Sequence, residues 1–416
     1  MKEPENYSES SIEKISNKYQ KVANNINAER KMNVSDQTVI FNLSESFIDP
    51  YMAPGVKIKG HDPIPFIRSM QNRSTYGKML STGYGGDTAN MEFQGLTGFT
   101  LGLMSIPTLV AYTQVVPYHP FFPTIGMNFK YKSAIHPFDG TFYSRIEDYQ
   151  RFSFNKFAYF GSKYKIYDQK KIDDNPNDSD FTLYYNALHQ IDSRKGGQFI
   201  SLLSIQNHMP YNNWYKHNEY KGKVFGKYLD NDEVRTSFAT YVKGTEYTDK
   251  AVKKFINHID NIDKPITIVF YGDHYPGILN SDLIYKYPIR LHSTRYFIYS
   301  NKYAREHGAK TKLDTNYNYV NTSEFIPMML EQTDSKVTAY QALLTEVHKK
   351  LPAITINYDG GKGFELIDHE TGKKVDQKTL TPEQKELLHD YELVQYDMNV
   401  GKSYALKNTN FYGKLK

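Results

Sequence analysis

The chain of 416 residues contains no cysteine. This absence excludes thiolate catalysis, cysteine-ligated zinc and disulfide bonds together. It is compatible with a bacterial protein that works outside the cytoplasm, where a stray thiol would be oxidised. Any nucleophilic catalysis must therefore use a different side chain.

The sequence also lacks a dense run of Lys or Arg. Its net charge of +5 is small against 51 basic and 46 acidic residues, so we expect no nucleic-acid partner. With 39% apolar and 23% charged residues, a packed core is expected. The length suits one large α/β domain with a small appendage. The 36 Tyr and 24 Phe suit a surface that contacts carbohydrate-like or amphiphilic ligands.

No segment of the sequence reads as a membrane span. The longest stretch without a formal charge, residues 93–129, exceeds the roughly 20 apolar residues that a span needs. Polar side chains interrupt it, and Pro117, Pro120 and Pro123 would break a helix. We expect buried core and a loop that lines a pocket. The charged start of the chain does not resemble a signal peptide, so a protein acting outside the cell would here be a fragment separated from its anchor.

Three regions are expected along the chain. Residues 1–35 are polar with apolar residues at helical spacing, which predicts a solvated linker helix from a missing membrane anchor. Residues 36–345 alternate strand-like and helix-like patterns, which predicts an α/β domain with a mostly parallel sheet flanked by helices. Residues 346–416 turn to short β-like pieces and one later helix, which predicts a small C-terminal α+β subdomain.

The strongest predicted strands are mostly apolar runs without a charged residue, at 38–43, 199–205 and 265–271. A further strand is expected at 296–300, and a helix followed by a strand within 62–80. Amphipathic helices are expected at 181–191 and 231–258.

Polar residues with metal-binding or nucleophilic chemistry follow three of these segments. Glu45 comes just after the first strand, Thr88 follows a Gly-rich turn, and Asp273-His274 follows the most hydrophobic strand. In a parallel sheet, functional groups gather beyond the carboxyl ends of the strands. Taken one at a time, these positions also have purely structural interpretations. Thr88 or Asn90 would cap a helix, and Asp273-His274 would lie in a surface turn.

Together these side chains predict a cation site. Two carboxylates, an imidazole and a hydroxyl can bind a divalent cation such as manganese, magnesium or zinc. The cation would withdraw charge from the Thr88 oxygen and make its alkoxide accessible near neutral pH. Such a nucleophile suits attack on a phosphorus or sulfur diester.

An ordered set of motifs carries a family resemblance. These motifs are Glu45-Ser46-Phe47, Thr88-Ala89-Asn90 with Glu92-Phe93, Asn207-His208 with Pro210-Tyr211, and Gly272-Asp273-His274. Over roughly residues 36–345 the chain resembles the lipoteichoic acid synthase and phosphoglycerol transferase family, a branch of the alkaline phosphatase/sulfatase superfamily. The resemblance implies the sulfatase-like fold for this region.

The resemblance also implies roles for single residues. It implies that Mn²⁺, with Mg²⁺ as the other candidate, is held by Glu45, Thr88, Asp273 and His274, and that Thr88 is the nucleophile. His208 would contact the phosphate or act as acid/base. The family's glycerophosphate-binding segment is similar to the stretch that carries His136, Asp139, Tyr143 and Arg145. Arg145 would hold phosphate oxygens in a bidentate fork.

The chain also departs from the family pattern. It has Tyr143 where the synthases commonly carry Trp, and Phe138 where they carry an acid, with an acid only at Asp139. The acceptor and head group therefore stay open. Alternatives also stay open for single residues: His136 and His208 as core histidines, and Arg145 paired on the surface with Glu147 or Asp148. Asn90 and Glu92 are interpreted as structural, a helix-start cap and a partner to nearby backbone.

Three functions are weighed. The first is transfer of glycerophosphate from phosphatidylglycerol, through Thr88, to a glycolipid, teichoic acid or glycan acceptor. The second is hydrolysis by the same site; a sulfatase is disfavoured because the nucleophile position holds neither Cys nor Ser. The third is a non-catalytic teichoic-acid-binding protein. We expect a monomer at the extracellular face of the bacterial membrane, anchored by N-terminal transmembrane helices outside this sequence or released by cleavage.

Overall fold

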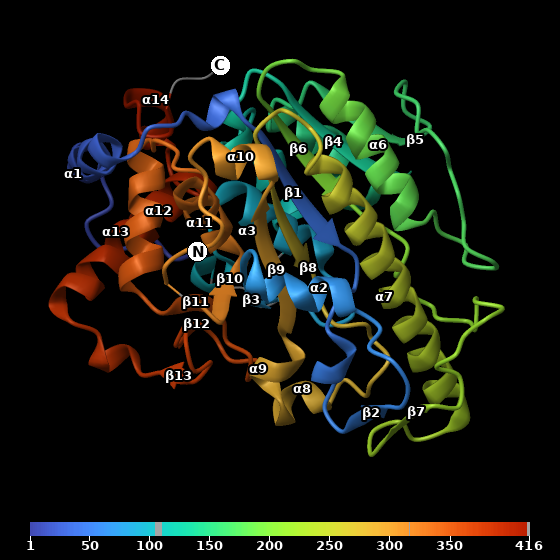
Figure 1. Ribbon diagram of the computed structural model, residues 1–416. Helices are drawn as coiled ribbons and strands as arrows, with labels where there is room; N and C mark the ends of the chain where they lie inside the picture. The colour runs from blue at the N-terminus through green and yellow to red at the C-terminus, as the bar shows by residue number, and fades with distance from the viewer. Residues whose placement is uncertain (105–109, 316, 414–416) are drawn as a thin grey trace.

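The computed structural model describes residues 1–104, 110–315 and 317–413, so part of the uncharged stretch 93–129 lies outside the described residues. Its centre is one eight-stranded sheet (Figure 1). In spatial order the strands are β10 (Tyr319–Asn321), β3 (Thr75–Leu80), β9 (Ser293–Ser300), β8 (Ile266–Gly272), β1 (Thr38–Ser44), β6 (Gln198–Leu203), β4 (Lys132–Asp139) and β5 (Lys156–Phe160). Within this sheet only β9 runs against its neighbours. The other strands therefore end at one common edge, as the predicted mostly parallel sheet requires.

Strand β1 lies in the middle of the sheet and is buried along its whole length. Its alternate residues point to opposite faces: Phe41 and Leu43 join one hydrophobic core and Ile40 joins another. A strand covered on both faces reads as a continuous apolar run, which is why 38–43 was recognisable. The strands predicted at 199–205, 265–271 and 296–300 are confirmed as β6, β8 and β9.

Helices cover both faces of the sheet and make three layers (Figure 1). On one face lie α2 (Pro65–Ser69), α6 (Asp180–Asp192) and α7 (Asp232–Ile259). On the other lie α1 (Glu9–Glu29), α3 (Thr88–Thr97), α11 (Phe325–Gln332), α12 (Ala339–Lys350), α13 (Pro382–Asn399) and α14 (Tyr404–Asn408). Leu183 and Val252 are typical of the buried stripes with which α6 and α7 meet the sheet.

Shorter elements complete the chain. They are α4 (Ala111–Gln114), α5 (Arg145–Arg151), α8 (Leu283–Lys286), α9 (Pro288–Leu291), α10 (Lys302–Glu306) and the two-stranded ribbon of β2 (Val56–Ile58) and β7 (Val224–Gly226). Among the described residues of the uncharged stretch, Phe93, Phe99 and Phe122 are buried, as expected for core. Of the helices that the structure describes, none combines the length and the apolarity that a membrane crossing needs.

The N-terminal helix is not the solvated linker that we expected. Its apolar stripe, which includes Ile12, Ile15 and Tyr19, is buried where α1 packs on α12 and α13. The Tyr19 hydroxyl also donates to Oδ2 of Asp390, on α13, at 2.9 Å. Helical spacing placed the helix correctly, but it could not show that a distant segment covers the stripe. Whether α1 leads to a membrane anchor stays a prediction.

The C-terminal region contains a small antiparallel sheet of β11 (Ala353–Ile356), β12 (Phe364–Ile367) and β13 (Lys374–Val375), followed by α13 and α14. The predicted α+β character is confirmed. This region shares its core with the main domain, since Leu366 and Val394 belong to the cluster that contains Phe93. The expected boundary between residues 345 and 346 falls inside α12.

Candidate active site

The structure brings Glu45, Thr88, Asp273 and His274 together at the common edge of the sheet. Oγ1 of Thr88 donates a hydrogen bond to Oδ2 of Asp273 at 2.8 Å and lies 3.3 Å from Nε2 of His274. The same imidazole nitrogen lies 3.2 Å from Oδ2 of Asp273 and 3.8 Å from Oε1 of Glu45. Four side chains spread over 230 positions of sequence thus converge on one point.

Local backbone geometry makes this convergence possible. Thr88 is the first residue of α3, after Gly85 and Asp87, which both adopt left-handed backbone angles with φ near +66° and +67°. Gly272 ends β8 where the chain passes very close to the segment after β1. A Cβ at this position would lie 1.8 Å from the carbonyl oxygen of Phe47, so only glycine fits.

Further hydrogen bonds fix the orientation of the acidic and imidazole groups. Oδ1 of Asp273 accepts the backbone N–H groups of Ser46 at 2.7 Å and His274 at 2.9 Å. The Ser46 hydroxyl donates to Oε1 of Glu45 at 2.8 Å. Nδ1 of His274 donates to the carbonyl of Tyr275, so its Nε2 presents a lone pair toward the carboxylates.

The donor set fits a divalent cation. Glu45, Asp273 and His274 are all buried, and each offers one ligand atom within 4.8 Å of the others. Burial and the neighbouring Glu45 carboxylate raise the pKa of Asp273 to about 6. Burial opposes protonation of His274, but the two carboxylates raise its pKa above the usual 6.5. The buried carboxylates of Glu45 and Asp273 repel each other, and a bound cation would reduce this repulsion.

A small cavity of about 70 Å³ opens beside Thr88. Its lining consists of Glu45, Thr88, His136, Phe138, Phe142, Tyr143, Arg145, Leu203, Ser204, Ile205 and His208. Its size suits a phosphoryl group with part of its substituent. Three residues of the predicted glycerophosphate segment, His136, Tyr143 and Arg145, therefore face the same space as Thr88.

Arg145 is anchored from behind, and not by the residues that we weighed as surface partners. Nε of Arg145 donates to Oε2 of Glu92 at 2.9 Å, and the Tyr149 hydroxyl donates to the other oxygen of Glu92. Pairing of Arg145 with Glu147 or Asp148 on a surface is therefore wrong, because the guanidinium is buried. The interpretation of Glu92 as a backbone partner is also wrong, since its carboxylate is saturated by side chains.

The remaining residues of this segment differ in their surroundings. Nδ1 of His136 donates to the Leu203 carbonyl, and burial together with the nearby Arg145 charge lowers the His136 pKa to about 3, so the ring is neutral. Tyr143 has φ near +58°, an uncommon backbone angle for a bulky residue that places its ring over the Arg145 guanidinium. Asn90 lies inside α3 and so is not the N-cap of that helix; its side-chain oxygen accepts the N–H of Ala111, the first residue of α4.

His208 and Asp139 lie toward the outside. His208 is exposed at the mouth of the cavity, where its ring stacks on Phe138 and its Nδ1 donates to the Met209 carbonyl. Asp139 is exposed and accepts hydrogen bonds from the backbone and hydroxyl of Thr141, outside the cavity lining. The structure thus brings His208, but not Asp139, to the cavity.

Sequence reasoning missed two contributors. The Ser204 hydroxyl, just after β6, accepts a hydrogen bond from the backbone N–H of Glu45 at 2.8 Å. This bond fixes the backbone that carries the Glu45 carboxylate. Phe142 is 50% exposed at the cavity and stands beside Phe138. The predicted strand 199–205 included Ser204, so the sequence did not show that this residue lies beyond the end of β6, and nothing local marked Phe142.

The fold and this site define a metal-dependent enzyme class, and comparison with known proteins identifies it. The Sulfatase family model matches residues 37–335. The structure of the Streptococcus pyogenes phosphoglycerol transferase GacH in complex with sn-glycerol-1-phosphate matches with a TM-score of 0.84 and 35% identity, over 100% of both chains. The chain therefore belongs to the sulfatase family.

Two further proteins are similar to this chain. The lipoteichoic acid synthase LtaP from Listeria monocytogenes shares the fold, with a TM-score of 0.57 and 17% identity over 94% of this chain and 99% of that one. A protein of Rhizobium meliloti (strain 1021) named "Putative cyclic beta-1,2-glucan modification protein" is 29% identical over 386 residues. The match covers 88% of this chain but 55% of that protein, so the chain spans about half the length of this curated relative.

Proposed function

We propose that this chain transfers glycerophosphate from phosphatidylglycerol to a hydroxyl group of a glycan, glycolipid or teichoic acid, through a covalent intermediate on Thr88. The observation that carries the proposal is the position of the Thr88 hydroxyl. It lies 2.8 Å from Asp273 and 3.3 Å from His274, at a cavity that Arg145 and His208 also line. The Thr88 hydroxyl, the candidate metal site and the Arg145 guanidinium thus lie around one small space.

A divalent cation, Mn²⁺ or Mg²⁺, would be held by Glu45, Thr88, Asp273 and His274. Its positive charge would favour the ionised form of the Thr88 hydroxyl and would offset negative charge on the phosphoryl oxygens. The donor set of oxygens with one imidazole suits either ion. Membership of a metal-dependent superfamily supports this requirement.

In the first step Oγ1 of Thr88 bonds to phosphorus while the bond from phosphorus to the diacylglycerol oxygen breaks. The Thr88 proton passes to solvent, and protonated His208 gives a proton to the leaving oxygen from Nε2. Nδ1 of His208 is already committed to the Met209 carbonyl, so Nε2 is the nitrogen free for this exchange. Glycerophosphate then remains on Thr88 as a phosphodiester.

In the second step the acceptor hydroxyl bonds to phosphorus, the bond to Oγ1 of Thr88 breaks, and Oγ1 takes a proton back from solvent. Neutral His208 takes the acceptor proton and returns to its starting form. In both steps the buried Arg145 guanidinium faces the developing phosphoryl charge without solvent rearrangement, because Glu92 already holds it in place. Two in-line displacements leave the configuration at phosphorus unchanged overall.

A glycan acceptor fits the rim of the cavity. Phe138 and the half-exposed Phe142 stand 5.4 Å apart at its mouth, beside the His208 ring. Aromatic faces of this kind pack against sugar rings. The printed name of the Rhizobium relative, a glucan modification protein, supports the same class of acceptor.

The proposed donor places the enzyme at a membrane surface. Phosphatidylglycerol is a membrane lipid, so the site must reach lipid head groups at the extracellular face of the cell membrane. We propose that the working protein is held there by an anchor beyond this sequence, or is released from one by cleavage. We propose that it acts as a monomer and has no nucleic-acid partner.

Product analysis tests this function. Purified chain is incubated with Mn²⁺, a fluorescent phosphatidylglycerol analogue and candidate acceptors, and the lipid and glycan products are separated. We expect diacylglycerol release together with glycerophosphate attached to an acceptor, abolished by a chelator and by Thr88→Ala but not by Thr113→Ala, an exposed threonine of α4. Free glycerophosphate alone would indicate a hydrolase, and no turnover with any acceptor would favour a binding protein.

A further inference from the structure

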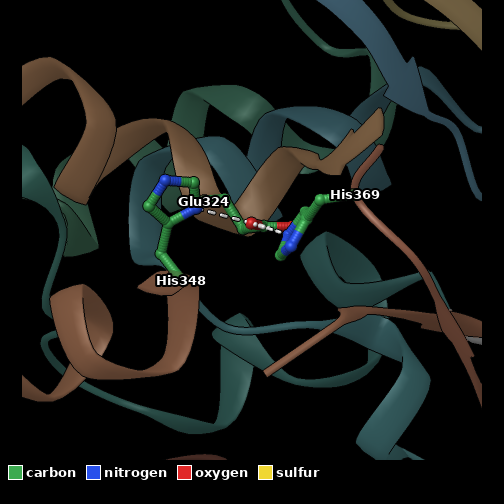
Figure 2. Close-up of side chains that lie close together, drawn as sticks. All are labelled: Glu324, His348 and His369. Atoms are coloured by element: carbon green, nitrogen blue, oxygen red, sulfur yellow. Dashed lines mark hydrogen bonds and ion pairs between the residues drawn. The ribbon is translucent and has the colours of Figure 1, made fainter. Parts of the chain in front are cut away.

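A second cluster of metal-ligating side chains shares no residue with the candidate active site. Glu324, His348 and His369 come together where η8 (Thr322–Glu324), α12 and the turn between β12 and β13 meet (Figure 2). Oε2 of Glu324 accepts one hydrogen bond from Nδ1 of His348 and another from Nε2 of His369, each at 2.7 Å. One carboxylate oxygen thus faces two imidazoles that come from separate elements.

The fold holds these groups in place before any ligand binds. Oε1 of Glu324 accepts the N–H of Asn321 at 2.7 Å, in the capping box at the start of η8, so only Oε2 is left for the imidazoles. The ring of Tyr317 packs against both imidazoles, with centroids 4.3 Å from His348 and 4.6 Å from His369. The three ligand atoms therefore have fixed directions, as a metal site requires.

The charge of the cluster also suits a cation. Glu324 supplies a carboxylate that is only 5% exposed, and its Oε2 faces both imidazole nitrogens. Among the described residues, Nε2 of His348 has no hydrogen-bond partner, so the hydrogen bond from Nδ1 to Glu324 and the packing of Tyr317 orient this ring.

We propose that Glu324, His348 and His369 form a structural binding site for zinc or a similar borderline divalent cation. Two imidazoles and one carboxylate are an ordinary zinc ligand set, with water in the fourth position. Bonds of about 2.0–2.1 Å in a tetrahedral site place ligand atoms roughly 3.3 Å apart, so each imidazole must move away from Oε2 by only about 0.6 Å. A cation bound through Nδ1 of His348 and Nε2 of His369 would leave each ring with its proton on the opposite nitrogen.

Such an ion would fasten the C-terminal sheet to the main domain. The backbone carbonyl of His369 already accepts the N–H of Tyr319, on the edge strand β10 of the central sheet. A cation bound to His369, Glu324 and His348 would add a link among β10, η8 and α12. The expected effect is therefore on stability, by mass action, and not on the reaction.

A third group of potential ligands, His61, Glu219 and Glu246, does not have these properties. The Lys243 ammonium group lies 2.6 Å from Glu219 and 2.8 Å from Glu246, so a protein cation already neutralises that cluster. The Glu324 cluster has no such ammonium among its described ion pairs.

The test separates the two sites by substitution. In an Asp273→Asn chain, which removes the acidic ligand of the active site, zinc is added, unbound metal is removed by gel filtration, and bound zinc and melting temperature are measured. We expect zinc bound in equal amount to the chain and a higher melting temperature. His369→Ala in the same background should lose both effects, and it is preferred to a His348 variant because His369 is partly exposed.

The matched control is His389→Gln, a partly exposed histidine of α13, which should keep both effects. Circular dichroism confirms that each variant is folded. Equal zinc content with and without His369, or no zinc retained by the folded Asp273→Asn chain, would show that the cluster is only a hydrogen-bonded clamp and would overturn the proposal. Neither result depends on transferase activity, so the proposed function stands or falls separately.

Discussion

Arg145 and Glu92 form a buried ion pair behind the candidate active site: Nε of Arg145 donates to Oε2 of Glu92 at 2.9 Å, with side chains only 3% and 1% exposed. The pair connects α5, which carries the arginine, to α3, which begins with Thr88. It therefore sets the distance between the nucleophile and the phosphate-binding guanidinium.

Glu92→Gln tests this relationship. The substitution keeps the shape but removes the charge that compensates the buried guanidinium, and breaking a buried pair costs about 3–5 kcal/mol. We expect the free energy of unfolding to fall by this order, with a loss of activity, in denaturant titrations. Glu147→Gln, at a nearby exposed position, should change stability by less than about 0.5 kcal/mol. Equal effects of the two variants would contradict the role of the pair.

Asp148 should destabilise the protein at high pH. Both its carboxylate oxygens are buried without a hydrogen bond among the described residues, and burial raises its pKa from 3.8 to about 8. The folded state therefore binds this proton more tightly than the unfolded state does. The resulting contribution to the free energy of unfolding is fully present below pH 4 and is lost as the pH rises through 8.

Asp148→Asn should therefore raise the unfolding free energy relative to the wild type, by about 1–3 kcal/mol at pH 9 and by little at pH 4. Thermal unfolding across this range measures the difference. A constant difference between the two proteins at every pH would mean that folding does not raise the pKa of Asp148.

Gly272 should tolerate no side chain. The Cβ of Gly272→Ala would meet the Phe47 carbonyl oxygen at 1.8 Å, which forces apart the two strand ends that carry Glu45 and Asp273. We expect a loss of more than about 4 kcal/mol of stability or failure to fold. Gly196→Ala, where nothing lies within 4 Å of the added Cβ, is the matched control and should remain folded. Near-normal stability of Gly272→Ala would disprove this close approach.

Metal removal should be visible in stability as well as activity. Manganese at 100 times its dissociation constant should add about 2.7 kcal/mol to the free energy of unfolding. Asp273→Asn should lose most of this gain, while Asp282→Asn, an exposed residue before α8, should keep it. The measurement is a thermal shift with and without Mn²⁺ after chelation. No difference between the variants would place the manganese elsewhere.

Much of this arrangement could be predicted from the sequence, for reasons that lie in local pattern. The strands that end before Glu45 and Asp273 are continuous apolar runs, and a parallel sheet brings their ends together. The partner of Arg145 could not be predicted, because it depends on how α3 packs beside α5. For the same reason neither the burial of α1 nor the approach of His369 to Glu324 was visible in the order of residues.

The most direct test of the central claim is to trap the covalent intermediate. The chain is incubated with Mn²⁺ and phosphatidylglycerol without acceptor, quenched in acid, and its peptides are analysed by mass spectrometry. We predict one glycerophosphoryl group on Thr88, released on addition of a glycan acceptor and absent from Thr88→Ala. Turnover of phosphatidylglycerol that proceeds in Thr88→Ala, or an adduct on a different residue, would contradict the account.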